Sequence, residues 1–417
     1  PLHPADIADL LEQVNAEDRT QILRLAGDYI DGEILSEIDE DIRDSVVETL
    51  SPAVLAEAVR ELESDDVVDI LEDLDQLQQE AVLDALDVVD RIAVEQALAY
   101  PEFSAGRLMQ REVVISPEHW SVGDAIDHMR AHTDLPEQFY HIVLVDPRHR
   151  PTAYVTLGRL MSSRREVALK DITEESFRTF DVTEDEGDVA YAINQYHLIT
   201  APVVDEDGRL VGVILIDDAM AVLDEEHEED VLRLGGVGDE SLSNSTFEIV
   251  KRRFPWLGIN LATAILASIV ISIFEDVLQA VVALAVLMPI VASMGGNAGT
   301  QSMTVAVRAL ATRDLTGSNA LRVVRREAAA GFLNGVIFAV VMGIVGVIWF
   351  GSPAIGFVIA VAMVVNLLVA GLSGVLVPLA LDKFGVDPAL AAGTFVTTVT
   401  DVVGFFAFLG LASVVLL

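Results

Sequence analysis

The sequence predicts a multidomain membrane protein: an all-α superhelical N-terminal domain, an α/β domain of two similar halves, and an all-α transmembrane domain with five helices. The chain has 417 residues, of which 52% are hydrophobic, and its mean hydropathy of +0.45 is too apolar for one soluble globule. Residues 1–250 carry 17 basic and 59 acidic side chains, whereas residues 251–417 carry 9 and 7. An acidic soluble part therefore precedes a nearly neutral, apolar part that is long enough to cross a bilayer several times.

The charge and the residue usage exclude several classes of function. An acidic soluble part repels nucleic acid and attracts cations, so no nucleic-acid partner is expected. The chain holds three lysines against 23 arginines, and acid excess with few lysines also suits a protein solvated in high salt. There are no cysteines, which excludes disulfides, thiolate metal sites and cysteine nucleophiles.

Residues 1–102 alternate short amphipathic helices with acidic turns. The stretches "ADIADLLEQVNAEDRTQIL", "AVLAEAVRELESDDVVDIL" and "QQEAVLDALDVVDRIAVEQAL" share apolar residues at helical spacing. Their loose self-similarity indicates stacked helical hairpins, a small superhelix that serves as a docking domain.

Residues 103–223 show a different pattern, repeated twice. Each half runs strand, amphipathic helix and two strands around a D-P or D-G turn, followed by another helix. The second half, with "APVVDEDGRLVGVILIDD", resembles the CBS domain family, which predicts CBS 1 at 103–165 and CBS 2 at 166–223. The adenosine-binding members of that family keep an Asp after the last strand. Asp217 and Asp218 fit this position, whereas "YVTLGRL" in the first half has no acid, so adenine-nucleotide (ATP) binding is an open alternative.

An acidic connecting helix over residues 224–253 is expected to lead into the transmembrane pore domain, residues 254–417. Apolar runs there predict spans over 256–274, 277–310, 328–350, 355–381 and 389–417. The second run is too long for one span and is expected to be broken by Pro289 and "MGGNAGTQ".

Basic residues set the predicted orientation. Lys251, Arg252 and Arg253 precede the first span, and five arginines lie between the second and third spans, while the alternate loops carry no basic residue. The positive-inside rule then places the N-terminus and the soluble domains in the cytoplasm and the C-terminus outside a multi-pass cytoplasmic membrane.

Two membrane stretches are polar where contact with lipid would be costly. In residues 288–305, Pro289 and three glycines permit an unwound or closely packed backbone, and Asn297, Thr300 and Gln301 supply oxygens. Such a stretch is tolerated inside protein or along a water-filled path. A pore lining and a simple glycine-rich packing seam are both open interpretations.

The second polar stretch, residues 387–404, contains the one charge of the last span. On a helix Asp401 shares a face with Thr394 and Thr397, and this face offers only oxygen ligands, which favour Mg²⁺ or Ca²⁺. One carboxylate cannot strip the water from Mg²⁺, but two chains sharing one pore could hold the hydrated ion between two copies of Asp401. A proton relay through Asp401 and a purely structural Asp remain alternatives.

The order of these parts, with "GGNAGTQ" and "DPAL…TTVTD" in the membrane, resembles the MgtE family of magnesium channels. The resemblance implies a homodimer in the bilayer with the pore on the dimer axis. It implies that Asp401 selects the ion, that Asn297, Ser293 and the backbone near Thr397 line the same site, and that Asp387 lies near the cytoplasmic mouth. Thr394 and Ser293 stand where the family often has Pro and Gly.

The acidic soluble part suggests a cation-dependent gate. Asp65 and Asp69 lie one helical turn apart, Asp218 follows the last strand of the second half, and "DEEHEED" (224–230) opens the connecting helix. These surfaces repel one another without cations, and a bridging divalent ion reverses this. The resemblance implies closure by cytoplasmic Mg²⁺ and places the regulatory ions at acidic positions: Asp65, Asp69, Asp185, Asp218, Glu226, Glu229 and Asp230. Ala221 and His197 stand where family carboxylates are common, and a merely solvated acidic surface is the alternative.

The predicted function is Mg²⁺ import through a Mg²⁺-selective channel that cytoplasmic Mg²⁺ closes. The alternatives are a cation-coupled carrier, a channel that prefers Co²⁺ or Ni²⁺, and a membrane-tethered Mg²⁺ sensor. No nucleophile–base pair or phosphate loop indicates an enzyme.

Overall fold

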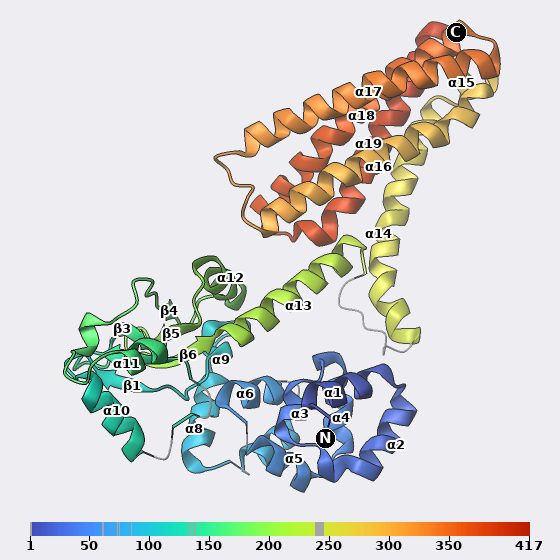
Figure 1. Ribbon diagram of the computed structural model, residues 1–417. Helices are drawn as coiled ribbons and strands as arrows, with labels where there is room; N and C mark the ends of the chain where they lie inside the picture. The colour runs from blue at the N-terminus through green and yellow to red at the C-terminus, as the bar shows by residue number, and fades with distance from the viewer. Residues whose placement is uncertain are drawn as a thin grey trace. The chain divides into compact units, whose positions relative to one another are not determined.

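The computed structural model describes a chain of two compact units, an N-terminal unit (Pro1–His227) and a C-terminal unit (Glu228–Leu417). Figure 1 shows the helices and strands of each. The residues described are 2–60, 62–72, 74, 76–84, 86–132, 135–136, 139–237 and 246–417.

The first part of the N-terminal unit is a stack of short helices, as the sequence predicts. They are α1 (Pro4–Gln13), α2 (Ala16–Ala26), α3 (Gly32–Ser36), α4 (Glu40–Thr49), α5 (Pro52–Val59), α6 (Ser64–Glu72), α7 (Gln76–Leu83) and α8 (Val88–Ala97), with a 3₁₀ turn at Gly27–Tyr29. Asn15 and Ser51 begin α2 and α5 by accepting backbone N–H bonds from Asp18 and Val54. One apolar core, which includes Leu35, runs through the stack.

The rest of the N-terminal unit contains two three-stranded sheets of identical topology. The first sheet has β1 (Ile115–Pro117), β2 (His141–Val145) and β3 (Pro151–Thr156), and the second has β4 (Phe180–Asp181), β5 (Thr200–Val204) and β6 (Leu210–Leu215). In each sheet the first pair of strands is parallel and the second pair antiparallel. The helices are α9 (Ala105–Leu108), α10 (Val122–Ala131), α11 (Leu157–Ser162) and α12 (Glu186–Tyr196), with a 3₁₀ turn at Leu169–Asp171.

The two antiparallel turns repeat the same hydrogen bonds. Asp146 Oδ1 accepts backbone bonds from Arg148 (2.8 Å) and Arg150 (2.9 Å), and Asp205 Oδ1 accepts equivalent bonds from Asp207 (3.0 Å) and Arg209 (2.8 Å). The D-P and D-G turns therefore follow from an aspartate that bonds its own loop. These paired halves confirm the predicted CBS fold.

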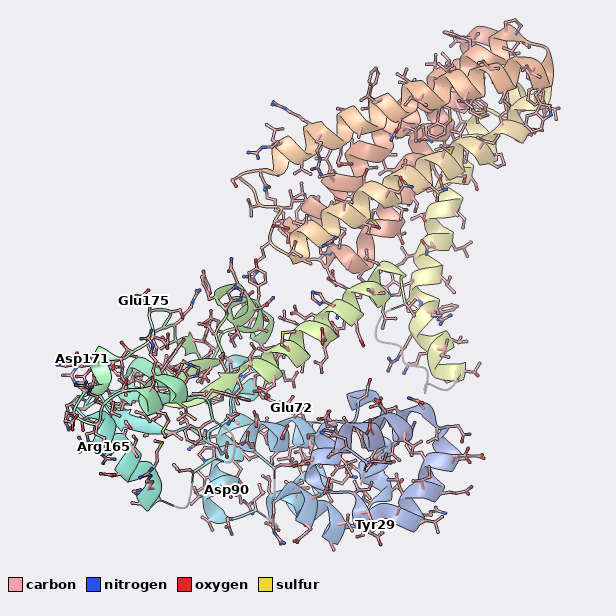
Figure 2. The ribbon with its side chains drawn as sticks, in the orientation of Figure 1. Tyr29, Glu72, Asp90, Arg165, Asp171 and Glu175 are labelled. Atoms are coloured by element: carbon pink, nitrogen blue, oxygen red, sulfur yellow. The ribbon has the colours of Figure 1, made fainter. Side chains whose placement is uncertain are left out.

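Carboxylates cover much of the surface of the N-terminal unit. Asp90, Asp171 and Glu175 are exposed examples (Figure 2). The bulk of the negative charge is therefore solvated, and a cation site has to be sought where carboxylates are buried together.

The connecting helix differs from the prediction. Helix α13 (Ile216–Leu234) begins directly after β6 and ends before Gly235 and Gly236, the second of which has a φ of +71°. Glycine adopts this left-handed conformation without strain and so ends the helix. The expected single helix over 224–253 is wrong, because α14 begins anew at Thr246; residues 238–245 lie outside the described part of the chain.

Five helices of the C-terminal unit are long and apolar enough to cross a membrane. They are α14 (Thr246–Ile273), α16 (Ala283–Ala311), α17 (Ala320–Phe350), α18 (Pro353–Lys383) and α19 (Pro388–Leu416), and the short α15 (Glu275–Ala280) joins the first two. Helix α18 packs against α16, α17 and α19, and α14 packs against α19.

The second apolar run is interrupted elsewhere than expected. The break falls at Val281 and Val282, between α15 and α16, and α16 continues as α-helix through Pro289 and "MGGNAGTQ". The glycines provide close packing instead of unwinding: Gly295 lies against Asn366 and Gly299 against Val396. Helix neighbours commonly compensate for the donor that Pro lacks inside a membrane helix.

Candidate functional site

A polar stripe runs along the outward face of α16. Asn297 Nδ2 donates a hydrogen bond to Ser293 Oγ at 3.3 Å, and both side chains are exposed in the single chain. The opposite face of the helix, with Val291, Gly295 and Gly299, is buried. The exposed stripe would be unfavourable against lipid, so it requires a polar surrounding.

Helix α19 carries a second polar stripe. Thr397 Oγ1 donates to the backbone oxygen of Gly393 (2.9 Å), and Thr398 Oγ1 donates to that of Thr394 (2.6 Å). The hydroxyl protons are thus directed into the helix itself, which leaves the lone pairs of both oxygens available to a cation.

Asp401 stands one turn after Thr397 on the same helix and is half-buried. In the part of the chain that the structure describes, no group donates a hydrogen bond or forms an ion pair to its carboxylate. An Asp with a purely structural role would be bonded to a neighbouring hydroxyl or cation, and neither contact is found here. The carboxylate is therefore available for an external partner.

The two stripes lie at similar depth. Gly299, two residues beyond Asn297, leaves room for Val396 and Thr400, which precedes Asp401. Thr400 is fully buried between the helices, so Asp401 follows directly on the contact of α19 with α16.

At the end of α19 nearer to α13, Asp387 is the N-cap and accepts the backbone N–H of Ala389 at 2.8 Å. Arg233, near the end of α13, contacts Asp387 at 3.4 Å and Glu229 at 2.6 Å. Glu229 is therefore paired with an arginine of its own helix, and Asp230 is half-buried beside it.

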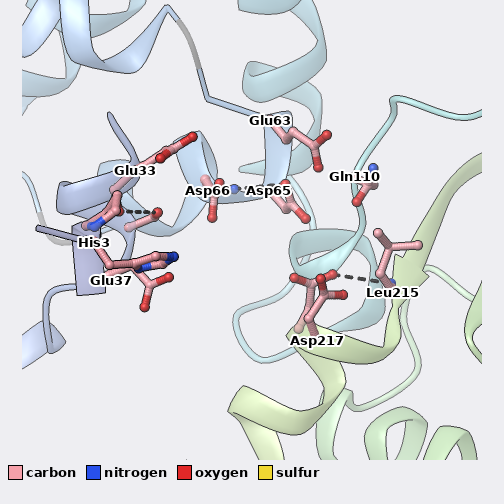
Figure 3. Close-up of a pocket in the computed structure, with 12 residues that line it drawn as sticks. His3, Glu33, Glu37, Glu63, Asp65, Asp66, Gln110, Leu215 and Asp217 are labelled. Atoms are coloured by element: carbon pink, nitrogen blue, oxygen red, sulfur yellow. Dashed lines mark hydrogen bonds between the residues drawn. The ribbon is translucent and has the colours of Figure 1, made fainter. Parts of the chain in front are cut away.

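The N-terminal unit contains an acidic pocket of about 400 Å³ between α6 and the start of α13 (Figure 3). Asp65 and Asp218 both line it, together with Glu63, Asp66 and Asp217. Asp66 N–H donates to Asp65 Oδ1 at 3.0 Å, and Leu215 N–H donates to Asp218 Oδ2 at 3.2 Å. Carboxylates in the first turn of a helix are stabilised by the helix dipole, which explains why both helices tolerate acids there.

Burial and mutual repulsion raise the pKa values of these carboxyl groups. Burial first, then the charge of Asp218, raises the pKa of Asp65 well above its ordinary value. Burial and Asp217 raise the pKa of Asp218 to about 7, and burial and Glu112 raise that of Glu63 to about 7. The pocket therefore holds more negative charge than its surroundings can stabilise, which is the environment that a divalent cation neutralises.

Asp69 is already paired. Arg43 Nη1 contacts Asp69 Oδ2 at 2.5 Å, and the Nε and Nη2 atoms of Arg43 donate to the backbone oxygen of Ile38. Asp69 faces a neighbouring cavity that Asp65 and Asp218 also line, but an arginine of α4 partly neutralises it. Twenty-six residues separate the pair, so local spacing could not reveal it.

Asp185 and Glu226 come together at the start of α12. Asp185 is the N-cap of this helix, and the Glu226 carboxylate lies where a side chain on Gly187 would stand. Glu186, which sequence reasoning missed, is half-buried beside them, and this partial burial and Glu225 raise its pKa to about 7.

The structure thus brings together Asp65 with Asp218 and Asp185 with Glu226, and leaves Asp69 and Glu229 in arginine pairs. Sequence reasoning assigned none of the other acids here to a cation site, and it named Asp217 only for nucleotide binding. The acids that it did not name include Glu33, Glu37, Glu63 and Asp66 in the pocket and Glu186 beside the neighbouring cavity. Glu63, Asp66 and Glu186 adjoin or nearly adjoin a chosen acid, but their partial burial could not be predicted from the sequence. Among the described residues, no group of three or more His, Asp or Glu side chains has a ready-made metal-binding arrangement. A cation would be held here through its water shell or after carboxylates turn toward it.

Comparison with known proteins assigns each part of the chain. The MgtE family, described as a divalent cation transporter, matches residues 288–411, the MgtE intracellular N domain matches residues 2–103, and the CBS domain matches residues 169–225. A crystal structure of the cytosolic domain of the Mg²⁺ channel MgtE in complex with ATP is 29% identical, covers 53% of this chain and 90% of that one, and has a TM-score of 0.48.

Full-length relatives extend the match. The magnesium transporter MgtE of Thermus thermophilus is 33% identical over 422 residues, which cover 100% of this chain and 93% of that protein. The magnesium transporter MgtE of Bacillus subtilis is 29% identical over 99% of this chain and 92% of that protein. With the three family regions, the CBS pair and the five apolar helices in one chain, the protein belongs to the MgtE family of magnesium transporters.

Proposed function

We propose that this chain is a Mg²⁺ channel of the cytoplasmic membrane, and that two copies form one pore on their shared axis. The observation that carries the proposal is Asp401, a carboxylate within a membrane-spanning helix whose neighbours Thr397 and Thr398 keep their oxygen lone pairs free. A pair of Asp401 carboxylates across the axis would balance the charge of one Mg²⁺, and the hydroxyl and amide oxygens would bond its water shell.

The polar stripe of α16 supports the same pore. Ser293 and Asn297 are exposed in one chain while the far face of α16 is buried, as expected if a second copy and a column of water cover them. Asp387 at the N-terminal end of α19 would then lie at the cytoplasmic mouth, where Arg233 partly balances its charge.

A gate in the N-terminal unit completes the proposal. At low Mg²⁺ the buried carboxylates around Asp65 and Asp218 repel one another and favour separation of α6 from α13. At high cytoplasmic Mg²⁺ the ion bridges these carboxylates and holds α6 against the start of α13. The soluble parts and the N-terminus lie in the cytoplasm, as the basic loops indicate.

Uptake by liposomes tests the role of Asp401. In liposomes that contain a Mg²⁺-sensitive dye, Asp401→Asn should lower the initial rate of Mg²⁺ entry by about tenfold or more, because each ~1.4 kcal/mol of lost ion stabilisation is a factor of ten. Asp382→Asn is the matched control, since Asp382 is an exposed carboxylate at the end of α18.

Normal uptake by Asp401→Asn would exclude the pore role of this residue. Uptake that requires an opposing or accompanying cation gradient would favour the coupled carrier, and a higher rate for Co²⁺ or Ni²⁺ than for Mg²⁺ would change the assigned ion. Mg²⁺ binding without any flux in the native protein would favour the tethered sensor.

A further inference from the structure

A buried polar side chain links the three central helices of the membrane unit. Asn366, in the middle of α18, is fully buried, and its Nδ2 donates a hydrogen bond of 2.7 Å to the backbone oxygen of Val291 in α16. This bond joins two helices 75 residues apart in the chain. A polar residue inside such an apolar bundle is costly unless it has a role.

Two glycines make room for Asn366. A side chain on Gly295 of α16 or on Gly404 of α19 would stand 2.8 Å from Asn366 Oδ1. The amide is therefore enclosed by the backbones of α16 and α19. Because glycine has no side chain, both helices approach α18 more closely here than they could with any other residue at positions 295 and 404.

The carboxamide is only half satisfied. Within the described residues, Asn366 Oδ1 is buried without a hydrogen-bond donor. An aliphatic side chain of similar volume would avoid this cost, so packing alone does not account for an asparagine here.

The position of this junction relative to the polar stripes suggests its role. Gly295 is two residues before Asn297, and Gly404 is three residues after Asp401. On α16, Gly295 lies on the opposite face from Asn297. On α19, Gly404 lies one turn beyond Asp401, on the face that carries Thr397 and Asp401. The amide group thus contacts α16 behind its polar stripe and contacts α19 beside its polar stripe, at the level of the proposed ion ligands.

We propose that Asn366 is a positioning residue for ion discrimination: by joining α16 to α18 and seating the backbone of α19, it sets the separation of Asn297 and Asp401. The inference rests on the proposed transport function. Hydrated Mg²⁺ has a rigid octahedral shell, whereas Ca²⁺ accepts variable geometry, so a looser pair of stripes disfavours Mg²⁺ relative to Ca²⁺.

Two substitutions and one control test the proposal in the full-length protein. Asn366→Leu removes the amide at similar volume, and Asn366→Ser shortens the side chain so that no clash can arise. Ser373→Ala is the control, because Ser373 is another buried polar residue of α18 but its hydroxyl bonds only to Ala370 of its own helix.

Initial rates of Mg²⁺ and Ca²⁺ entry into dye-loaded liposomes are measured over a range of ion concentrations. We expect the Mg²⁺-to-Ca²⁺ rate ratio to fall about fivefold or more in both Asn366 variants, because a site held loosely by its supporting residues loses geometric precision. The half-saturating Mg²⁺ concentration should rise, and Ser373→Ala should match the native protein in both quantities.

A folded Asn366→Leu or Asn366→Ser protein with an unchanged ratio would overturn the proposal. Equal losses of Mg²⁺ and Ca²⁺ entry would do the same, since they would indicate general damage instead of positioning. If Leu prevents folding, the Ser variant decides. A native protein without Mg²⁺ flux would contradict the proposed transport function. That outcome differs from an unchanged rate ratio in the Asn366 variants, which would contradict only the role of Asn366.

Discussion

At the scale of single residues, the proposed ion site of the membrane unit depends on which side-chain oxygens already take part in hydrogen bonds and which do not. Thr397 and Thr398 donate to their own backbone, whereas Asp401 receives no bond from the described residues. A carboxylate inside a membrane-spanning helix costs several kcal/mol of free energy against lipid, and a cation opposite it removes most of this cost. The same arrangement explains why the sequence could identify Asp401: one charge in an apolar run is visible without coordinates.

The residue scale also predicts a dependence of stability on pH. The pKa values of Glu63, Asp218 and Glu186 are raised to about 7, and that of Asp66 to about 6, chiefly by burial. A carboxyl with a raised pKa in the folded state binds its proton more tightly there than in the unfolded state. Its stabilising contribution is present at acid pH and is lost as the pH rises toward 7.

We therefore expect the soluble part, in the presence of a chelator, to resist heat and protease better at pH 5 than at pH 7.5. Added Mg²⁺ should restore resistance at pH 7.5 and change little at pH 5, because protons and Mg²⁺ compete for the same carboxylates. The measurement is the rate of proteolysis of the full-length protein at both pH values, with and without Mg²⁺.

Variants separate this pocket from the general acidic surface. Asp65→Asn with Asp218→Asn should reduce the difference between the two pH values, because it removes two of the carboxyl groups with raised pKa values, whereas Glu175→Gln, at an exposed position, should leave it unchanged. A difference in the double variant as large as in the native protein would refute the assignment to this pocket.

At the scale of elements, glycines determine how closely the membrane helices pack. A side chain on Gly331 of α17 would stand 2.5 Å from the backbone oxygen of Leu367 in α18, and one on Gly335 would stand 2.9 Å from Val364 Cα. The obstacle in both cases is backbone, which cannot turn aside as a side chain can.

Gly331→Ala should therefore destabilise the membrane unit by roughly 1–3 kcal/mol, the usual cost of overpacking a close contact. Gly258→Ala in α14 is the control, because nothing lies within 4 Å of a side chain placed there. Thermal unfolding in detergent, followed by helical circular dichroism, checks the difference. Equal midpoints for the two variants would contradict this account of the contact between α17 and α18.

The elements show how far the sequence could predict the fold. Apolar length predicts five spans, and the repeated D-P and D-G turns predict the paired sheets, because each signal is local. The continuity of α16 through Pro289 could not be predicted, since it depends on packing against α18 and α19. The helix after the last strand of the second half was predicted, but its continuation past residue 223 as the single helix α13 was not.

The candidate site was likewise predictable from the sequence only in part. Asp65 and Asp218 were found from their acidic surroundings, and the structure places them in one pocket. The pairing of Asp69 with Arg43 and the junction at Asn366 join residues far apart in the chain, and a single sequence carries no signal for such contacts. The partial burial of Glu63 and Glu186 is likewise a property of tertiary structure.

At the scale of the whole molecule, the family assignment joins an acidic soluble unit to an apolar membrane unit in one chain. Helix α13 belongs to both, beginning at the acidic pocket and ending at Leu234, one residue after Arg233, which contacts Asp387 of α19. Within the C-terminal unit, the end of α13 thus adjoins the start of α19.

The most direct test of the account is electrical recording of the reconstituted full-length protein with Mg²⁺ as the permeant ion. We expect a Mg²⁺ current that reverses at the Mg²⁺ equilibrium potential and disappears when millimolar Mg²⁺ is added on the side of the soluble unit. In Asp65→Asn with Asp218→Asn the current should persist at this Mg²⁺ concentration. Asp401→Asn should lower this current by about tenfold or more at every Mg²⁺ concentration. A current that Asp401→Asn leaves intact, or closure by Mg²⁺ that the double variant leaves intact, would contradict this account.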